Sequence, residues 1–279
     1  MYYFRSVENQ SASYPKYTFN EALNQEQISY FNQTGFIQFR NFLSKDHVKN
    51  ILDSLNELQE QWIRDDVKVI NGVPIHYGFD DEGNKIVHRF AFTSLHCPII
   101  HDLVKGPEIR ELLKLLNRTD GRIGETEKDG VVVNQYINSE KSERKQMGWH
   151  TDSLRDIFYG QKILPMLNVG IYLSDSKLEQ GGLKILPGTH KQSIYSMLFK
   201  KPYFVNNEPD KNEVSVIAEA GDLTVHHGHI WHRVAMAPFM GVVSRRIIMY
   251  IPLICGKQIP KSETSETPFY HRLKKFAKR

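Results

Sequence analysis

Three residues have the types and the spacing of a mononuclear metal site: His150, Asp152 and His232. His150 and Asp152 are two positions apart, and residues at this spacing in a β-strand point to the same face, so both can bind one ion. His232 comes after segment 221–227, which we expect to form a strand that ends in a turn. Two imidazoles and one carboxylate on one side of an ion leave its other side open to exchangeable ligands, an arrangement that suits non-heme Fe(II).

A single His-x-Asp triplet is weak evidence, because a random order of this composition gives on the order of one such triplet. A hydrogen-bonded surface pair on a strand would explain it equally well. The downstream sequence strengthens the metal hypothesis. Arg245 and Arg246 together open an apolar, β-rich run that reaches Leu253. Adjacent strand residues face opposite ways, so one of the two guanidiniums should point inward and require an anion such as a carboxylate.

The order of these landmarks resembles the phytanoyl-CoA dioxygenase family. After the His150/Asp152 pair come the segment Leu-Pro-Gly-Thr-His-Lys at 186–191, then Gly221-Asp222 with a distal histidine, and then an arginine at the start of the last strand. The resemblance covers roughly residues 36–252. It implies an Fe(II)- and 2-oxoglutarate-dependent oxygenase built on a double-stranded β-helix, which is a jelly-roll, cupin-like fold.

The resemblance also implies roles for individual residues. Carried over by position, His150, Asp152 and His232 would bind iron, and Arg245 would bind the distal carboxylate of 2-oxoglutarate. Arg245 is preferred to Arg246 because the arginine of the family usually opens this strand. Gln135, on the first barrel strand, is chosen by position as a polar contact of the cosubstrate or substrate. The implied reaction consumes O₂ and 2-oxoglutarate, hydroxylates an unactivated C–H of a small-molecule or acyl-type substrate, and releases succinate and CO₂.

Two other classes of function remain open. A cupin-like zinc hydrolase or isomerase could use the same metal ligands, but it would not need Arg245 and would not decarboxylate 2-oxoglutarate. A non-catalytic small-molecule-binding relative would show no metal-dependent turnover. The family spacing favours His232 over its neighbours His226 and His229, so we expect both neighbours to be dispensable. The sequence selects neither the substrate nor the oxidised position.

The predicted elements suit a mainly β fold with N-terminal helices. One helix should run from Asn24 to Gly35, another should be capped by Ser44, and a third should span 107–116. The expected strands are 36–39, 131–137, the His150 region, 166–173, 182–186, 214–217, 223–227, 234–237 and 245–254. We expect one domain over 1–279: a helical preface with a lid-like insert (1–130, the insert at 69–101), a β-helix core (131–254) and a basic C-terminal tail (255–279).

Composition adds weaker constraints. The net charge is +4, and much of the excess lies in the C-terminal run 271–279, which we expect to be a solvated tail. Cys97 and Cys255 are the only cysteines, which is typical of a reducing compartment. No leader peptide and no membrane-spanning apolar stretch is visible. We therefore expect a cytoplasmic protein whose partner is a small molecule, with no nucleic-acid or integral-membrane contact and with an open oligomeric state.

Overall fold

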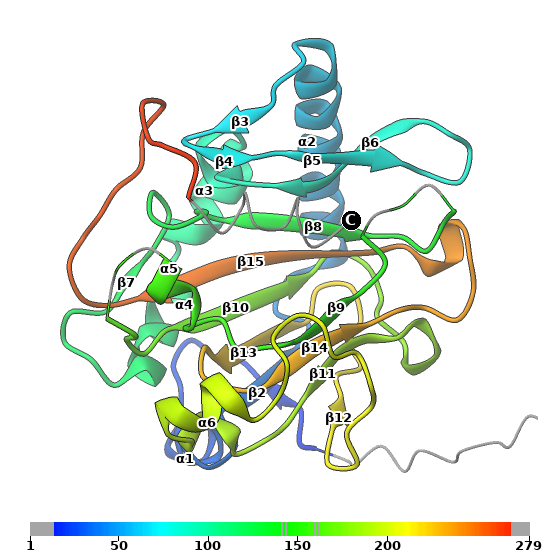
Figure 1. Cartoon of the computed structure of the whole chain (residues 1–279). Helices are drawn as coiled ribbons and strands as arrows, with labels where there is room; N and C mark the ends of the chain where they lie inside the picture. The colour runs from blue at the N-terminus through cyan, green and yellow to red at the C-terminus, as the bar shows by residue number, and fades with distance from the viewer. Residues whose placement is uncertain (1–13, 141, 143, 159, 161, 269–279) are drawn as a thin grey trace, which may run out of the picture.

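Two β-sheets lie face to face, and helices cover the outer side of the larger one (Figure 1). The computed structural model describes residues 14–140, 142, 144–158, 160 and 162–268. The chain start and the basic run 271–279 lie outside the described residues. The expected class, mainly β with N-terminal helices in a jelly-roll arrangement, is confirmed.

The larger sheet is nine-stranded over the described residues, with the order β1-β2-β13-β10-β15-β8-β6-β5 and with β7 paired to β15. Its strands are β1 (Tyr17–Thr18), β2 (Phe36–Arg40), β5 (His76–Phe79), β6 (Lys85–Phe90), β7 (Arg122–Ile123), β8 (Val132–Tyr136), β10 (Leu167–Tyr172), β13 (Leu223–His227) and β15 (Arg246–Ile254). The segment before residue 131 is therefore not only a helical preface, because it supplies five of these strands. The prediction of a single domain stays a prediction.

The smaller sheet has the order β12-β11-β14-β9. Its strands are β9 (Met147–His150), β11 (Gly182–Ile185), β12 (Val214–Ser215) and β14 (His232–Ala235), and a separate hairpin pairs β3 (Val69–Ile70) with β4 (Val73–Pro74). Two strand starts differ from the sequence prediction. β14 begins at His232 rather than at 234, and β15 begins at Arg246 rather than at Arg245.

The helices are α1 (Gln25–Thr34), α2 (Lys45–Arg64), α3 (Pro98–Lys105), α4 (Pro107–Glu111), α5 (Arg155–Phe158) and α6 (Ile194–Phe199). The predicted start and end of α1 and the predicted start of α2 are confirmed. The Asn24 side chain accepts a hydrogen bond from the Gln27 amide at the start of α1, and Gly35 ends this helix with φ of 75°. Ser44 caps α2. The predicted helix 107–116 is α4 followed by a turn of 3₁₀-helix.

Two hydrophobic cores divide the side chains of β15 by alternation. Ile247 and Met249 belong to the core between the larger sheet and the helices, whereas Ile248 belongs to the core between the two sheets. Arg246 and Tyr250 are on the Ile248 side of the strand, because they are separated from Ile248 by two positions. The side chains of Arg246 and Tyr250 therefore point into the interior of the barrel, between the two sheets.

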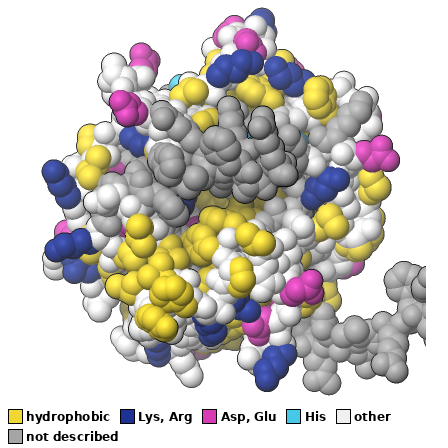
Figure 2. Space-filling view, in the orientation of Figure 1, with side chains coloured by type: hydrophobic (Ala, Val, Ile, Leu, Met, Phe, Trp, Pro, Cys, Tyr) yellow, Lys and Arg dark blue, Asp and Glu magenta, His cyan; other side chains and the backbone are white. Residues whose placement is uncertain are grey.

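Exposed hydrophobic side chains gather over α6, in the lower left of Figure 2. Tyr195 and Phe199 are the most exposed of them, at 73% and 68%. Among the described helices, none has the length and the apolar character needed to cross a membrane.

Candidate active site

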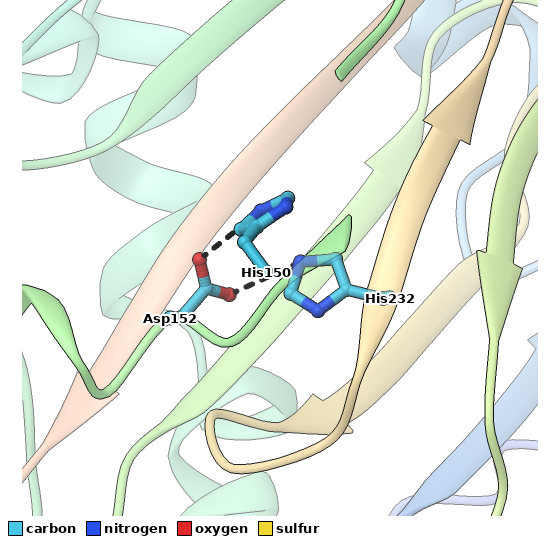
Figure 3. Close-up of side chains that lie close together, drawn as sticks. All are labelled: His150, Asp152 and His232. Atoms are coloured by element: carbon cyan, nitrogen blue, oxygen red, sulfur yellow. Dashed lines mark ion pairs between the residues drawn. The ribbon is translucent and has the colours of Figure 1, made fainter. Parts of the chain in front are cut away.

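Pairing of β9 with β14 brings the three predicted metal ligands together. His150 is the last residue of β9, His232 is the first residue of β14, and the two are direct partners in the register. Asp152 lies two residues past the end of β9, in a bend rather than on the strand as expected. The candidate ligand atoms of the three residues all lie within 4.8 Å of one another, and all three side chains are buried. Figure 3 shows the two imidazoles and the carboxylate converging on one space.

Backbone contacts fix the orientation of both imidazoles. His150 Nδ1 donates to the carbonyl of Gly148 at 2.8 Å, and His232 Nδ1 donates to that of Ile230 at 3.1 Å. The His150 ring also stacks on Phe204, with centroids 4.7 Å apart. Since Nδ1 carries the proton in each ring, Nε2 keeps its lone pair and faces Asp152. The Nε2 atoms lie 3.9 Å (His150) and 3.7 Å (His232) from the nearest carboxylate oxygen of Asp152.

Two further side chains hold the Asp152 carboxylate. Asn168 Nδ2 donates to Oδ2 at 2.9 Å, and His226 Nε2 lies 3.3 Å from the same oxygen. Burial alone would favour the neutral acid, but the neighbouring His232 and the hydrogen bond from His226 hold the pKa of Asp152 well below its ordinary value. Burial and the neighbouring His150 lower the pKa of His232 well below 6.5. Asp152 is therefore an ionised carboxylate and His232 a neutral imidazole, which are the protonation states that bind a metal.

His226 is a functional candidate that the sequence analysis set aside. It is 1% exposed and lies on β13, where it is the cross-strand partner of Asn168 on β10. The two residues that contact Asp152 thus come from adjacent positions of the larger sheet. The signal was present in the alternation of β13, since Thr224 and His226 point to the same side.

Arg245 does not face the interior, and the prediction of its orientation is wrong. Its Nε and Nη2 donate to Gln135 Oε1, at 3.2 and 2.6 Å. Arg246 is the inward residue and is 1% exposed. Arg245 belongs to the turn before β15, whereas Arg246 is in the strand, opposite Tyr136 and on the same side as Ile248 in the core between the sheets.

Gln135 does not face the cavity either, so its predicted contact with the cosubstrate is not supported by its position. Gln135 lies opposite Ile247 on the outer side of the sheet, where it contacts Arg245. Its neighbours Asn134 and Tyr136 face inward and line the cavity that contains the metal triad. The first barrel strand therefore does supply polar groups to the site, from positions 134 and 136.

Arg246 is buried and forms no ion pair with any described residue. Its Nη2 donates to the carbonyl of Ala235 at 3.1 Å, but Nε and Nη1 have no hydrogen-bond partner among the described residues. Ser176 Oγ is also buried without a partner there, and a Cβ added at Gly182 would lie 2.6 Å from it and 3.2 Å from Arg246 Nη1. A guanidinium and a hydroxyl with free hydrogen-bonding capacity fit a carboxylate.

Tyr250 is linked electrostatically to both Arg246 and the metal triad. Burial and the nearby Tyr136 raise the pKa of Tyr250 well above its ordinary value, and both Asp152 and Arg246 act electrostatically on it. Tyr250 also lines the cavity together with His150, Asp152 and His232.

A cavity of about 640 Å³ opens over the triad. This volume suits a small-molecule ligand. The predicted lid-like insert contributes His76, Tyr77, His88 and Arg89 to its walls, and Lys128, Arg144 and Arg155 add further positive charge. The expectation that the insert borders the site agrees with this lining.

The chain matches the phytanoyl-CoA dioxygenase family over residues 31–235. A probable alpha-ketoglutarate-dependent hypophosphite dioxygenase of Stutzerimonas stutzeri is 22% identical over 80% of this chain and 76% of that protein. An ectoine dioxygenase of Bordetella bronchiseptica is 24% identical over 75% of this chain and 66% of that protein.

Solved structures share the fold at low identity. The non-heme alpha-ketoglutarate-dependent carbocyclase SnoK from nogalamycin biosynthesis has a TM-score of 0.59 at 18% identity, over 88% of this chain and 89% of that one. HygX from Streptomyces hygroscopicus, solved with nickel and 2-oxoglutarate bound, has a TM-score of 0.57 at 15% identity, over 88% and 89%.

Proposed function

Because the chain belongs to the phytanoyl-CoA dioxygenase family, we propose that His150, Asp152 and His232 bind Fe(II) and that Arg246 anchors 2-oxoglutarate. The enzyme class follows from the family: the protein is a 2-oxoglutarate-dependent non-heme iron dioxygenase, with Fe(II), 2-oxoglutarate and O₂ as its cofactor and cosubstrates. The expected class and cofactors are confirmed. The roles of single residues and the type of oxidation belong to the proposal.

The observation that carries the residue assignment is the pair of free N–H groups on buried Arg246. Leaving a buried guanidinium without an anion is costly, so its place in the folded protein is best explained by a bound carboxylate. Ser176 can donate a further hydrogen bond to the same carboxylate, and the absence of a side chain at Gly182 leaves room for it. A zinc hydrolase would have no use for this space.

Bound iron and 2-oxoglutarate supply the oxidising chemistry, in which O₂ is activated as 2-oxoglutarate is converted to succinate and CO₂. The protein residues prepare the site for it. Asn168 and His226 hold the Asp152 carboxylate, and backbone carbonyls fix the tautomers of the two imidazoles. Three protein ligands leave the remaining positions for exchangeable ligands. The walls of the cavity shield these positions from bulk water.

The finer proposal is hydroxylation of an unactivated C–H in a small molecule that enters this cavity. Asp152 supports hydroxylation over halogenation, because related halogenases replace the carboxylate ligand with a small residue to make room for halide. The cavity volume of about 640 Å³ supports a compact substrate.

The test is an anaerobic titration of Fe(II)-loaded protein with 2-oxoglutarate. Binding is monitored through the visible charge-transfer band of the iron chelate. We expect Arg246→Met to weaken 2-oxoglutarate binding by about thirty-fold or more, since losing a buried charge-assisted contact costs roughly 2–5 kcal/mol. Arg246→Lys should recover little, because an ammonium cannot reproduce the guanidinium fork.

Arg245→Met is the matched control, since its guanidinium contacts Gln135 on the outer side of the sheet. It should bind 2-oxoglutarate nearly as wild type does. Equal effects of the two methionine variants would remove Arg246 from its proposed role. A wild-type protein that binds iron but shows no chelate band would overturn the proposed function itself.

A further inference from the structure

Arg144 places a guanidinium in the wall of the cavity, and this residue is distinct from Arg246, which is assigned to 2-oxoglutarate. Its side chain lines the cavity over the metal triad, and its carbon Cζ lies 5.6 Å from the centroid of the Tyr136 ring. Its Nε is buried and has no hydrogen-bond partner in the part of the chain that the structure describes. No described carboxylate lies within ion-pair distance of Arg144. Among the described residues, the Arg144 guanidinium therefore lines the cavity without an anionic partner.

Arg89 adds to the excess of positive charge. It is 8% exposed, and its Nη2 donates to Asp129 Oδ2 at 2.8 Å, while its Nη1 has no partner among the described residues. Asp129 also contacts Arg155 Nη1 at 3.4 Å, so one carboxylate serves two guanidiniums. Arg89 and Arg144 line the same cavity. Burial lowers the pKa of Arg144, and the charge of Arg89 adds to the lowering, whereas Tyr136 opposes it.

Arg144 and Arg246 both lie beside Tyr136, but only Arg144 lines the cavity. Arg246 lies 5.5 Å from the centroid of this ring, and the groups that act on its pKa, after its burial, are tyrosines. Tyr136 and Tyr250 act on the pKa of Arg144 as well, and Arg89 acts on it in addition. If Arg246 holds the cosubstrate, Arg144 remains available for a second anion.

We propose that the substrate carries an anionic group, a carboxylate or a phosphoryl group, which Arg144 binds with the help of Arg89. The inference rests on the proposed function, because it assigns the cavity over the iron ligands to the substrate. A guanidinium presents parallel N–H donors that match the oxygens of either anion. The anionic end then fixes the substrate in the cavity, and the remainder of the molecule extends toward the metal triad.

Three probes test this inference by calorimetry: inorganic phosphate, hexanoate and hexanamide, the neutral counterpart of hexanoate. They are titrated anaerobically into protein loaded with Fe(II) and 2-oxoglutarate. We expect at least one anion to bind at least tenfold more tightly than hexanamide. Arg144→Met should weaken that anion at least tenfold and leave 2-oxoglutarate affinity unchanged, and Arg144→Lys should recover part of the loss.

Arg110→Met is the matched control, since Arg110 is an exposed residue of α4 outside the cavity. It should bind every probe as wild type does. Arg144→Gln gives the same comparison if the methionine variant folds poorly. The inference is overturned if neither anion binds better than hexanamide, or if the Arg144 variants bind the anions as tightly as wild type.

A parallel titration separates this inference from the proposed function. Metal-free Arg246→Met protein cannot hold an anion at position 246. Binding of an anion to this variant therefore reports on Arg144 alone. We expect this variant to keep its affinity for the anion while it loses affinity for 2-oxoglutarate. Loss of both ligands in Arg246→Met, with both retained in Arg144→Met, would assign the anion to Arg246 and overturn the inference.

Discussion

The Asp152 carboxylate accepts hydrogen bonds from two side chains that are not themselves metal ligands, Asn168 and His226. Such partners set the orientation of a ligand and its readiness to bind, and their loss typically costs 10–100-fold in metal affinity. His226 was expected to be dispensable. Its complete burial against Asp152 leads to a different expectation.

We expect His226→Ala to weaken Fe(II) binding by about tenfold or more, because Asp152 loses a donor that favours its ionised, oriented form. His150→Ala should abolish binding, since it removes a ligand. Anaerobic Fe(II) titration measures both. His229→Ala is the control, because His229 does not line the cavity. Wild-type affinity in His226→Ala would mean that Asn168 alone suffices to hold the carboxylate.

The start of β11 bounds the space in front of Arg246, and glycine is required there. Gly182 has φ of +84°, and an added Cβ would lie 2.6 Å from Ser176 Oγ and 3.2 Å from Arg246 Nη1. Gly188, just beyond the end of the same strand, has φ of +80° but open space around it. The two positions share the backbone conformation and differ in what a side chain would meet.

Alanine substitutions at these two glycines distinguish backbone strain from obstruction of the space beside Arg246. Both should destabilise the fold by about 1–2 kcal/mol, because an L-residue is strained at such φ values. Only Gly182→Ala should also weaken 2-oxoglutarate binding, several-fold or more, since its methyl group enters the space beside Arg246. Urea unfolding and the chelate titration give the two quantities. If both variants keep wild-type 2-oxoglutarate affinity, the cosubstrate does not lie beside Gly182.

At the scale of the whole molecule, strands that precede residue 131 and strands that follow it share the larger sheet, so we expect the described residues to unfold as one unit.

A cluster of histidines lies where β13 ends beside the turn at Gly35. The ring centroid of His227 lies 5.6 Å from that of His190 and 4.7 Å from that of His229. Burial, with the nearby histidines, lowers the pKa of His227 from 6.5 to about 3.

Stability should therefore decrease in acid. The unfolded chain takes up a proton at His227 below about pH 6.5, whereas the folded protein resists it until about pH 3. Stability is full above pH 6.5 and is lost as the pH falls toward 3, by up to about 1.4 kcal/mol per pH unit for this group. His227→Asn, which keeps an acceptor for the His229 amide, should flatten the decline. Urea unfolding of metal-free protein at pH 7.5 and pH 5 measures this. An unchanged decline would exclude His227 as a contributor.

The fold class and the three residues that come together at the candidate metal site could be predicted from the sequence. The spacing of His150 and Asp152 and the alternating strands are local patterns, and the resemblance to the family selected His232. The capping residues Asn24, Gly35 and Ser44 likewise act within one turn of their helices.

The tertiary structure decided which arginine faces the interior. Both Arg245 and Arg246 satisfied the sequence pattern, and only the register of β15 with its neighbours places Arg246 on the inner side. The same register places Asn134 and Tyr136, and not Gln135, in the lining of the cavity. The role of His226 and the unpaired charge of Arg144 depend on contacts between segments far apart in the chain, which no local pattern encodes.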